Sequence, residues 1–264
     1  MLGFRELVNS LHQLGVKNQF PVIAHINADL PGKVKGGAKT VVGALLTATD
    51  NIILPAFTTR TMVIPETGPA NNALEYGSGR ESNLNVEIFT KELAADEPYL
   101  EITNTLHHYP GAFRSSHPVL SFVGLGMNTA LDAQTVNHPY APIKSLLDLK
   151  GMVLLMGVDQ TKNFSIHYAE HLAGRKQFTR WGVSAEGTLE CNPFPGCPDG
   201  FNKINIHIET LKHQITIADQ IWQAYPLQDF ISVTTELLKK DPFSLLCNRL
   251  KCERCNAVRN SIAN

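Results

Sequence analysis

The sequence predicts an α/β fold with a central, mostly parallel sheet flanked by helices. Four short apolar runs rich in β-prone residues recur along the chain, at residues 21–26, 51–57, 119–123 and 151–158. Their nearly continuous apolar character is typical of strands buried on both faces, as in the central sheet of an α/β protein. Helical patterns lie between these runs, and 264 residues with 43% hydrophobic content suffice for one large domain.

The helices are predicted from the spacing of apolar residues and from glycines at their ends. Over the first 14 residues the apolar positions recur at helical spacing, which indicates an amphipathic helix rather than a signal peptide. The helix that follows the fourth strand stops at Gly174. The predicted helices cover residues 2–14, 39–49, 145–149 and 165–173.

Two regions differ from this alternating pattern within the single domain expected over residues 1–264. Residues 62–110 are rich in Pro, Gly and Asn and become acidic, so we expect a long excursion that forms an inserted substrate lobe. Residues 202–240 combine β-like runs (INIHIE, ITIA) with a helical end (ISVTTELLKK). The C-terminal part, residues 191–264, contains all five cysteines.

The charge and the hydropathy exclude some classes of protein. The formal net charge is −1, which does not favour general adhesion to nucleic acid or to a membrane surface. No apolar stretch approaches the ~20 residues of a membrane span. Five cysteines, an odd number, argue against a fully paired secreted framework. We therefore expect a cytoplasmic protein with no nucleic-acid or membrane partner.

The segment that follows the fourth strand contains the first candidate for chemistry. His167 falls in the first turn of a helix beside the carboxyl end of a buried strand, where open α/β sheets place ligands. Histidine titrates near neutrality and can take a proton from an attacking amine. Glu170 lies three residues on, so it shares a helix face with His167. The alternative is a hydrogen-bonded structural histidine.

Two other polar segments lie next to predicted strands. His25 ends the first strand, and Gly36-Gly37 precede a helix whose free N–H groups suit a phosphate, although no P-loop or GxGxxG fingerprint is present. Residues 114–122 (RSSHPVLSF) lead into the third strand. Their polar groups fit a pocket entrance, and the alternative is a strand-entry turn with its backbone set by Pro118.

The cysteines predict a zinc site. Cys252 and Cys255 form a CxxC, Cys247 precedes it, and Cys197 follows a Pro/Gly-rich turn. Four thiolates suit a tetrahedral structural Zn(II) that ties the C-terminal tail to the body. Cys191 is the substitute for Cys197, and the alternatives are free buried cysteines or a redox pair.

In chain order and separation, these segments resemble the aminoglycoside 3-N-acetyltransferase family. The matching pieces are the loop after His25 with its two glycines, ILPAF (53–57), RSSHPVLSF (114–122) and VLLMGV…NFSIHYAEHLAGR (153–175). The pair HPVLSF and SIHYAEHLA is the most specific. The resemblance covers roughly the first 200 residues.

The resemblance implies direct transfer of an acetyl group from acetyl-CoA to an amine, without a covalent acyl-enzyme. It implies that His167 is the general base and that Glu170 supports it. The resemblance also implies a coenzyme site formed by His25, Asn27, Ala28, Asp29, Lys35, Gly36, Gly37, Ser121 and Phe122. Family members often carry a Ser-Ser pair where this chain has Asn27-Ala28-Asp29, and Asp29 is unfavourable beside a phosphate.

The implied substrate is an aminoglycoside, a polycation that needs an acidic cleft, and the implied role is antibiotic resistance. The candidate acids are Glu66, Glu75, Glu81, Asp96, Glu97 and Glu101. One alternative is an acetyltransferase of the same fold that acts on another small amine. Others are a zinc-bearing nucleic-acid-binding module and a metallo-hydrolase that uses His25, His117, His167 or His171. The sequence does not define an oligomeric state.

Overall fold

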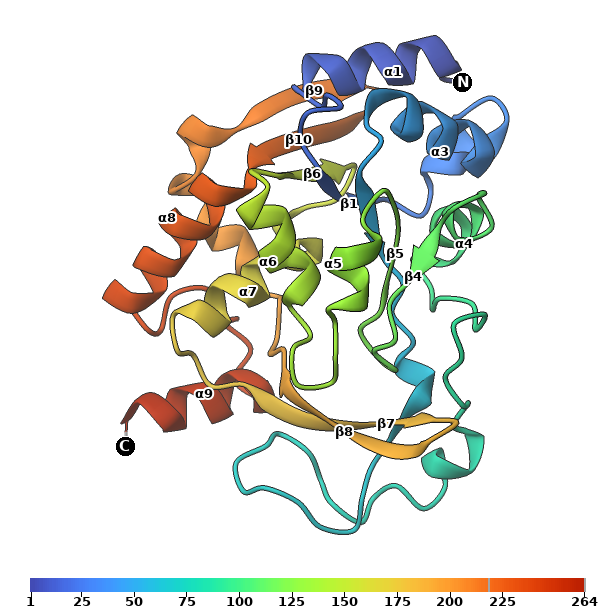
Figure 1. Cartoon of the computed structure of the whole chain (residues 1–264). Helices are drawn as coiled ribbons and strands as arrows, with labels where there is room; N and C mark the ends of the chain where they lie inside the picture. The colour runs from blue at the N-terminus through green and yellow to red at the C-terminus, as the bar shows by residue number, and fades with distance from the viewer. Residues whose placement is uncertain (218, 264) are drawn as a thin grey trace.

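The computed structural model describes residues 1–217 and 219–263 and shows a seven-stranded sheet between two layers of helices (Figure 1). A smaller three-stranded sheet lies at the end away from the first helix. The strands are β1 (Val22–Ile26), β2 (Ile52–Pro55), β3 (Met62–Val63), β4 (Phe113–Arg114), β5 (Phe122–Leu125), β6 (Met152–Met156), β7 (Phe178–Ser184), β8 (Gly187–Phe194), β9 (His213–Ile217) and β10 (Gln220–Pro226).

The helices alternate with the strands over most of the chain. The α-helices are α1 (Phe4–Gln13), α2 (Leu30–Lys33), α3 (Gly37–Ala48), α4 (Leu100–His107), α5 (Asn128–Asp132), α6 (Ala141–Asp148), α7 (Ser165–Leu172), α8 (Leu227–Lys240) and α9 (Glu253–Ala263). The 3-10 helices are η1 (Thr59–Thr61), η2 (Ser82–Asn85), η3 (Gln160–Lys162), η4 (Phe201–Ile206) and η5 (Glu209–Leu211). Each of the four apolar runs and each of the four helical patterns overlaps an element of the predicted type.

The large sheet is mixed rather than mostly parallel. Its strand order is β4-β5-β2-β1-β6-β10-β9, and β1 pairs in parallel with β2 and β6. The other four pairs are antiparallel. The expected parallel arrangement is therefore correct only for the three central strands. Consecutive outer strands such as β4 and β5 are joined by a short connection, which favours antiparallel pairing.

Both faces of the central strands are buried, as the apolar runs predict. Ile23, Val153 and Leu155 belong to a core cluster with residues of α5, α6, α7 and α8. Val22 and Leu154 belong to a second cluster with residues of α1, α3 and α4. Adjacent residues of one strand thus enter opposite cores, because successive side chains of a strand point to opposite faces.

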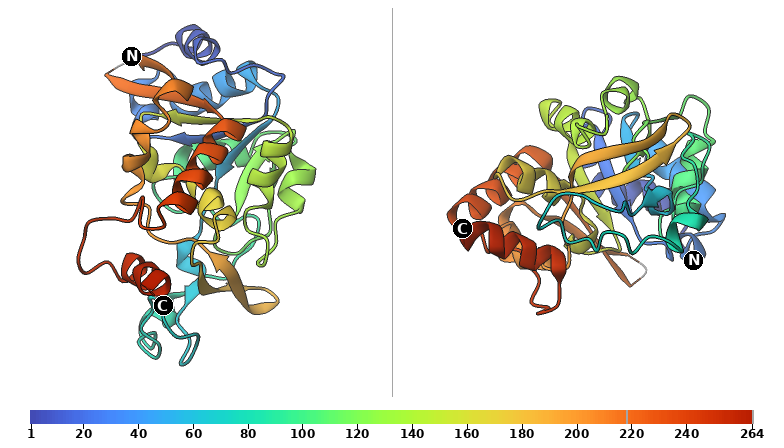
Figure 2. Two further views of the ribbon diagram at one scale, coloured as in Figure 1. Left: turned by 90° about the vertical axis from the view of Figure 1, so that its left-hand side faces the viewer. Right: turned by 90° about the horizontal axis from the view of Figure 1, so that it is seen from below.

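The excursion at residues 62–110 contributes β3, η2 and α4. β3 pairs with β7 and so completes the small sheet β3-β7-β8. The loop after β3 lies beside α9 (Figure 2), and Asn71 Nδ2 donates to the carbonyl oxygen of Ala257 at 3.1 Å. The excursion therefore connects the small sheet to the C-terminal tail.

One expected β-like run is wrong. INIHIE (204–209) covers the end of the 3-10 helix η4, the turn that follows it and the first residue of η5. Ile204 and Ile208 are buried, whereas Ile206 is 82% exposed, so burial follows a helical rather than an alternating period. Residues 215–217 of ITIA lie in β9, as predicted, whereas residue 218 lies outside the described residues; ISVTTELLKK lies within α8, as predicted. Among the described residues, the helices lack the length and apolar character required to cross a bilayer.

The pairing of β1 with β6 fixes the place of the candidate site. Their register runs from Val22 opposite Met152 to Ile26 opposite Met156, so both strands end at the same level. Asn27 then bonds the first residues after β6: its N–H donates to Met156 O and its Nδ2 to Gly157 O, each at 2.9 Å. The two loops therefore leave the sheet side by side.

Candidate active site

A cavity of about 380 Å³ opens where β1 and β6 end, which is where open α/β sheets bind ligands. Four of the predicted coenzyme-binding residues line it: His25, Asn27, Ala28 and Asp29. Tyr99, just before α4, forms part of the wall, and Asp159 and Lys162 from the loop after β6 form another part. The cavity thus combines residues from both strand ends with the base of the excursion.

His25 is only 2% exposed, and neither of its ring nitrogens has a hydrogen-bond partner among the described residues. Burial lowers the pKa of His25 to about 3. The ring is therefore neutral at physiological pH, with one N–H and one lone pair unused by the protein. Such an unpartnered buried group at a cavity wall is unfavourable for folding unless a ligand or water satisfies it.

The other predicted coenzyme residues lie elsewhere. Lys35, Gly36 and Gly37 are at the N-terminus of α3, outside the residues that line this cavity. Gly36 has φ +89°, and a β-carbon there would approach Thr40 Oγ1 to 2.4 Å, so the helix start requires glycine. Glu101 is exposed and faces Gly37, which places a negative charge beside the expected phosphate position.

Ser121 and Phe122 are fully buried at the start of β5. The Ser121 hydroxyl donates to Ala56 O at 2.8 Å and accepts from Arg114 Nε at 3.1 Å. Phe122 packs edge-on against Phe57, with ring centroids 5.6 Å apart. The structure therefore places both residues in the interior of the sheet rather than at the cavity wall.

His167 and Glu170 form a buried pair on α7. His167 Nδ1 and Glu170 Oε2 are 2.7 Å apart, and the two residues are 5% and 3% exposed. An ionised carboxylate can only accept hydrogen bonds, so the ring nitrogen facing it carries the proton. The lone pair then resides on Nε2, which makes no hydrogen bond within residues 1–217 and 219–263. This arrangement suits a general base.

Arg175 completes the charge balance around Glu170. Its Nη1 donates to Glu170 Oε1 at 2.8 Å, and its side chain is 4% exposed. Burial alone would raise the pKa of the Glu170 carboxyl, but the hydrogen bonds from His167 and Arg175 and the charge of Arg175 outweigh it and leave that pKa below its ordinary value. Glu170 is therefore ionised at neutral pH and holds His167 in the required tautomer.

A chain of aromatic contacts connects this pair to the cavity. The His167 ring packs between Phe164 and Phe201, at centroid distances of 5.3 and 4.8 Å. Phe164 packs on Phe57 at 4.9 Å, and Phe57 packs on Tyr99, which lines the cavity, at 5.3 Å. The imidazole and the cavity are thus linked by adjoining side chains in contact.

The polar wall of the cavity is held by the same segment that contacts His167. Asn202 Nδ2 donates to Asp159 Oδ2 at 2.7 Å, and Asn202 Oδ1 accepts from Gln160 N at 3.1 Å. Burial would raise the pKa of Asp159, but bonds from Thr161 and Asn202 leave it below its ordinary value. Sequence reasoning missed Tyr99, Arg175 and the segment at 201–202. Of these, only Arg175 could have been identified from the sequence, because its positive charge lies five residues beyond Glu170.

The predicted acidic residues of the substrate cleft do not form one cluster at this cavity. Asp96 forms an ion pair with Arg60, and its other oxygen accepts from the Thr59 hydroxyl at 2.6 Å. Glu97 directly precedes Pro98, a residue of the cavity wall. The other candidates are exposed at the surface: Glu66, Glu75, Glu81 and Glu101.

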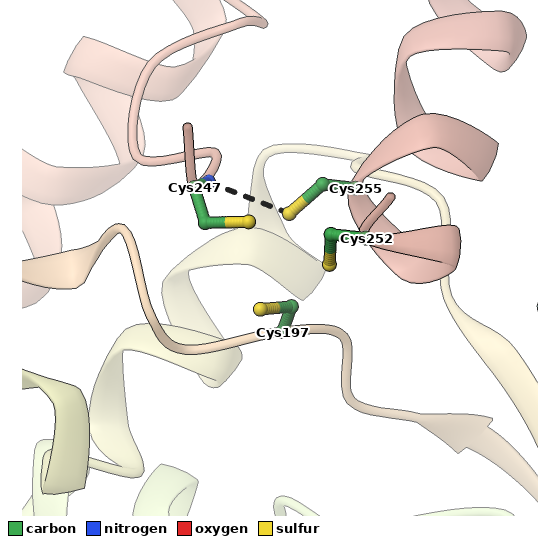
Figure 3. A group of neighbouring side chains, drawn as sticks. All are labelled: Cys197, Cys247, Cys252 and Cys255. Carbon is green, nitrogen blue, oxygen red and sulfur yellow. Dashed lines mark hydrogen bonds between the residues drawn. The ribbon is translucent and has the colours of Figure 1, made fainter. Parts of the chain in front are cut away.

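Four cysteines converge at the C-terminal side of the molecule. The sulfur atoms of Cys197, Cys247, Cys252 and Cys255 all lie within 4.8 Å of one another. Figure 3 shows the four side chains pointing toward a common centre. Cys191 is fully buried in β8 outside this cluster. Among the described residues, the histidines of the metallo-hydrolase alternative form no comparable group of convergent ligand atoms.

Comparison with known proteins places these features in one family. A family model described as aminoglycoside 3-N-acetyltransferase matches residues 23–239. Aminoglycoside N(3)-acetyltransferase IX of Micromonospora chalcea is 30% identical over 176 residues, a match that spans 62% of this chain and 60% of that enzyme. Aminoglycoside N(3)-acetyltransferase III of Serratia marcescens is 25% identical, over 91% of this chain and 98% of that enzyme.

Solved structures share the fold at low sequence identity. The apoenzyme of aminoglycoside acetyltransferase AAC(3)-IVa aligns with a TM-score of 0.79 at 19% identity, covering 98% of this chain and 97% of its own. A structure of AAC-IIIb holds coenzyme A (TM-score 0.70, 20% identity, coverage 90% and 97%). A histidine-to-alanine variant of AAC(3)-IVa is in complex with a gentamicin (TM-score 0.75, 18% identity, coverage 97% and 96%).

The buried His25 predicts a measurable pH dependence of stability. Unfolded His25 takes up a proton near pH 6.5, whereas folded His25 does so only near pH 3, so folding loses stability as the pH falls between these values. We expect His25→Leu to reduce the slope of unfolding free energy against pH by about 1.4 kcal/mol per pH unit in this window. Urea titrations at several pH values measure it.

His117 is also buried with its pKa lowered to about 3, so part of the slope should remain in the variant. The exposed His12 provides a matched control, because His12→Gln should leave the curve unchanged. Parallel curves for the wild type and His25→Leu would show that His25 is not buried as a neutral ring.

Proposed function

The chain belongs to the aminoglycoside 3-N-acetyltransferase family, and we propose that it transfers the acetyl group of acetyl-CoA to the 3-amine of an aminoglycoside. The observation that carries this proposal is the buried His167–Glu170 pair, which adjoining aromatic side chains link to the cavity at the β1–β6 edge. The family supplies the reaction, and the pair supplies the base that the reaction requires.

The cavity supports a coenzyme site. Its position at the strand ends fits a coenzyme, and Lys162 provides a cation for a phosphate. The resemblance also assigns phosphate contacts to the start of α3, which lies outside the residues that line this cavity. Asp29 and Glu101 oppose a phosphate directly at these positions, so we assign the phosphates to the Lys162 side and the pantetheine arm to the side of Asn27.

The base acts as the amine attacks the thioester. The amine nitrogen forms a bond to the acetyl carbonyl carbon and gives its proton to His167 Nε2, while the ionised Glu170 stabilises the imidazolium. The carbon–sulfur bond then breaks, and coenzyme A leaves as a thiolate that takes the proton from His167. The products are the N-acetylated amine and coenzyme A, with no acyl-enzyme.

The substrate proposal is a polycationic aminoglycoside, the class for which the family is named. Exposed acids along residues 62–110 supply negative surface charge, and Glu97 directly precedes Pro98 of the cavity wall. Modification of such a drug would confer antibiotic resistance. We place the enzyme in the cytoplasm, where thiols remain reduced, because its cysteines are unpaired.

The role of His167 is testable by substitution. We expect His167→Ala to lower kcat by about 10²–10⁴-fold, the usual share of general-base catalysis, while acetyl-CoA binding survives. Thiol release with acetyl-CoA and a panel of 2-deoxystreptamine drugs measures turnover, and calorimetry measures binding. His171→Ala is the matched control, since His171 is exposed on the same helix and should leave turnover unchanged.

Wild-type turnover by His167→Ala would refute the base assignment. An enzyme that binds acetyl-CoA but acetylates none of the drugs would indicate that its substrate is another small amine. An enzyme that does neither would refute the proposed activity.

We further propose that the cysteine cluster binds one structural Zn(II). Tetrahedral zinc with bonds of about 2.3 Å to sulfur separates its ligands by about 3.8 Å, and the four sulfur atoms here lie within 4.8 Å of one another. Four thiolates leave no position for a reactive water, so the metal would bind the tail and would not contact the reacting atoms.

Elemental analysis tests the zinc proposal. We expect one zinc per purified chain, its loss in Cys252→Ser, and its retention in Cys191→Ser, because Cys191 lies outside the cluster. Loss of metal should also lower the thermal midpoint, since structural zinc contributes directly to folding. Wild-type protein without metal, or equal metal content in both variants, would contradict the assignment.

A further inference from the structure

Two chain segments that end in the cysteine cluster pass next to the His167–Glu170 pair: one contacts His167, and the other contacts Arg175, which holds Glu170. Phe201 lies four residues after Cys197, and Ser244 lies three residues before Cys247. The first packs on the imidazole and the second binds the arginine that holds the carboxylate. The cluster and the pair are therefore joined by two short paths.

The first path runs from Cys197 to the imidazole. Phe201 is fully buried, and its ring meets the His167 ring edge-on at an angle of 61°. The next residue, Asn202, holds Asp159 at the cavity wall. The position of this segment therefore determines both the packing around the His167 ring and the shape of the cavity wall at Asp159.

The second path runs from Cys247 to the carboxylate. Arg175 Nη2 donates to Ser244 O at 2.6 Å and to Pro242 O at 2.7 Å, while its Nη1 donates to Glu170. The planar guanidinium can satisfy these partners together, whereas a lysine ammonium presents a single point charge. A displacement of the loop at 241–252 would therefore move Arg175, the residue that forms an ion pair with Glu170.

The two paths touch each other near the cluster. A β-carbon on Gly200 would lie 2.2 Å from Leu245 O, so the segments pass in direct backbone contact. Lys203 Nζ donates to Leu246 O at 2.6 Å. The ion pair of Arg249 with Asp199 is solvent-exposed and so contributes little. Neither segment near the cysteines is a regular helix or sheet strand, so four metal–sulfur bonds would be their firmest restraint.

We propose that the metal-loaded cysteine cluster is a positioning element for the His167–Glu170 pair and acts through Phe201 and Arg175. The expected change in kcat rests on the proposed function, whereas the expected change in the His167 hydrogen bond does not. Arg175 is a positioning residue, since it touches Glu170 and not the reacting atoms.

The experiment compares full-length preparations of zinc-loaded wild type, metal-stripped wild type, and zinc-loaded Arg175→Lys and Phe201→Leu. Turnover is followed by mass spectrometry of the product, so that protein thiols do not interfere. The Nδ1 proton of His167 is followed by nitrogen-15 NMR and assigned with His167→Gln. Arg175→Lys retains a cation near Glu170 but not the bonds to the loop. Lys176→Gln, one residue away, is the control.

We expect metal removal and Arg175→Lys each to lower kcat by about 10- to 100-fold, the effect of a small misplacement of a reacting group, with the KM for acetyl-CoA unchanged. Phe201→Leu should act in the same direction. The His167 Nδ1 proton signal should weaken or disappear in all three, and added zinc should restore it in the stripped protein. Lys176→Gln should match the wild type.

Folded, metal-stripped protein with full kcat and an unchanged His167 signal would overturn the proposal and leave the cluster a brace for the tail alone. If stripping unfolds the protein, Arg175→Lys and Phe201→Leu decide: wild-type kcat and signal in both would overturn it. If the wild type acetylates no drug, the proposed function fails, and the His167 signal still tests this inference.

Discussion

The burial of the Glu170 carboxylate is the constraint on which the rest of the site depends. A carboxylate with 3% exposure is strongly unfavourable unless opposite charge and hydrogen bonds compensate it. His167 and Arg175 each donate to one of its oxygens. These hydrogen bonds fix the tautomer of His167. They also hold Arg175, whose other terminal nitrogen donates to the carbonyl oxygens of Pro242 and Ser244 in the C-terminal segment.

The fold divides the work between rigid and adaptable parts. The parallel strands β1 and β6 end at one level at the cavity, and α7 carries the base, which a chain of aromatic side chains links to that cavity. Strands β1 and β6 contribute to the core clusters on both faces of the sheet, and α7 packs into one of these clusters. The excursion at 62–110 contributes Tyr99 to the cavity wall, and the C-terminal segment accepts hydrogen bonds from Arg175 at Pro242 and Ser244. Variation in substrate is best accommodated by these outer parts, since loops tolerate change better than the core.

Local patterns were sufficient where a single element determines the result. The strand-loop-helix at residues 152–172 was predictable, because apolar burial and a glycine stop define it and helical spacing alone puts His167 and Glu170 together. The four cysteines were predictable as a group, since CxxC and a turn-borne thiol are typical of zinc sites. INIHIE alternates like a strand, yet among the described strands none pairs with it, and most of it lies in a 3-10 helix.

Contacts across the fold could not be derived in the same way. Phe201 reaches His167, and Arg175 reaches Ser244, only because the β7–β8 hairpin and α8 return the chain to α7. No spacing in the sequence encodes that return. Ser121 and Phe122 lie in a motif that is specific to the family, yet their side chains are used inside the sheet. A motif indicates ancestry more directly than it indicates contact with a ligand.

Two-substrate kinetics tests the central claim, direct His167-assisted transfer from acetyl-CoA to an aminoglycoside amine, most directly. Initial rates are measured while acetyl-CoA and a 2-deoxystreptamine drug are varied together. Double-reciprocal plots that intersect would show that both substrates occupy the site before any product leaves, as direct transfer requires. Parallel plots, with an acetylated enzyme detected by mass spectrometry, would show a covalent intermediate and would contradict the account.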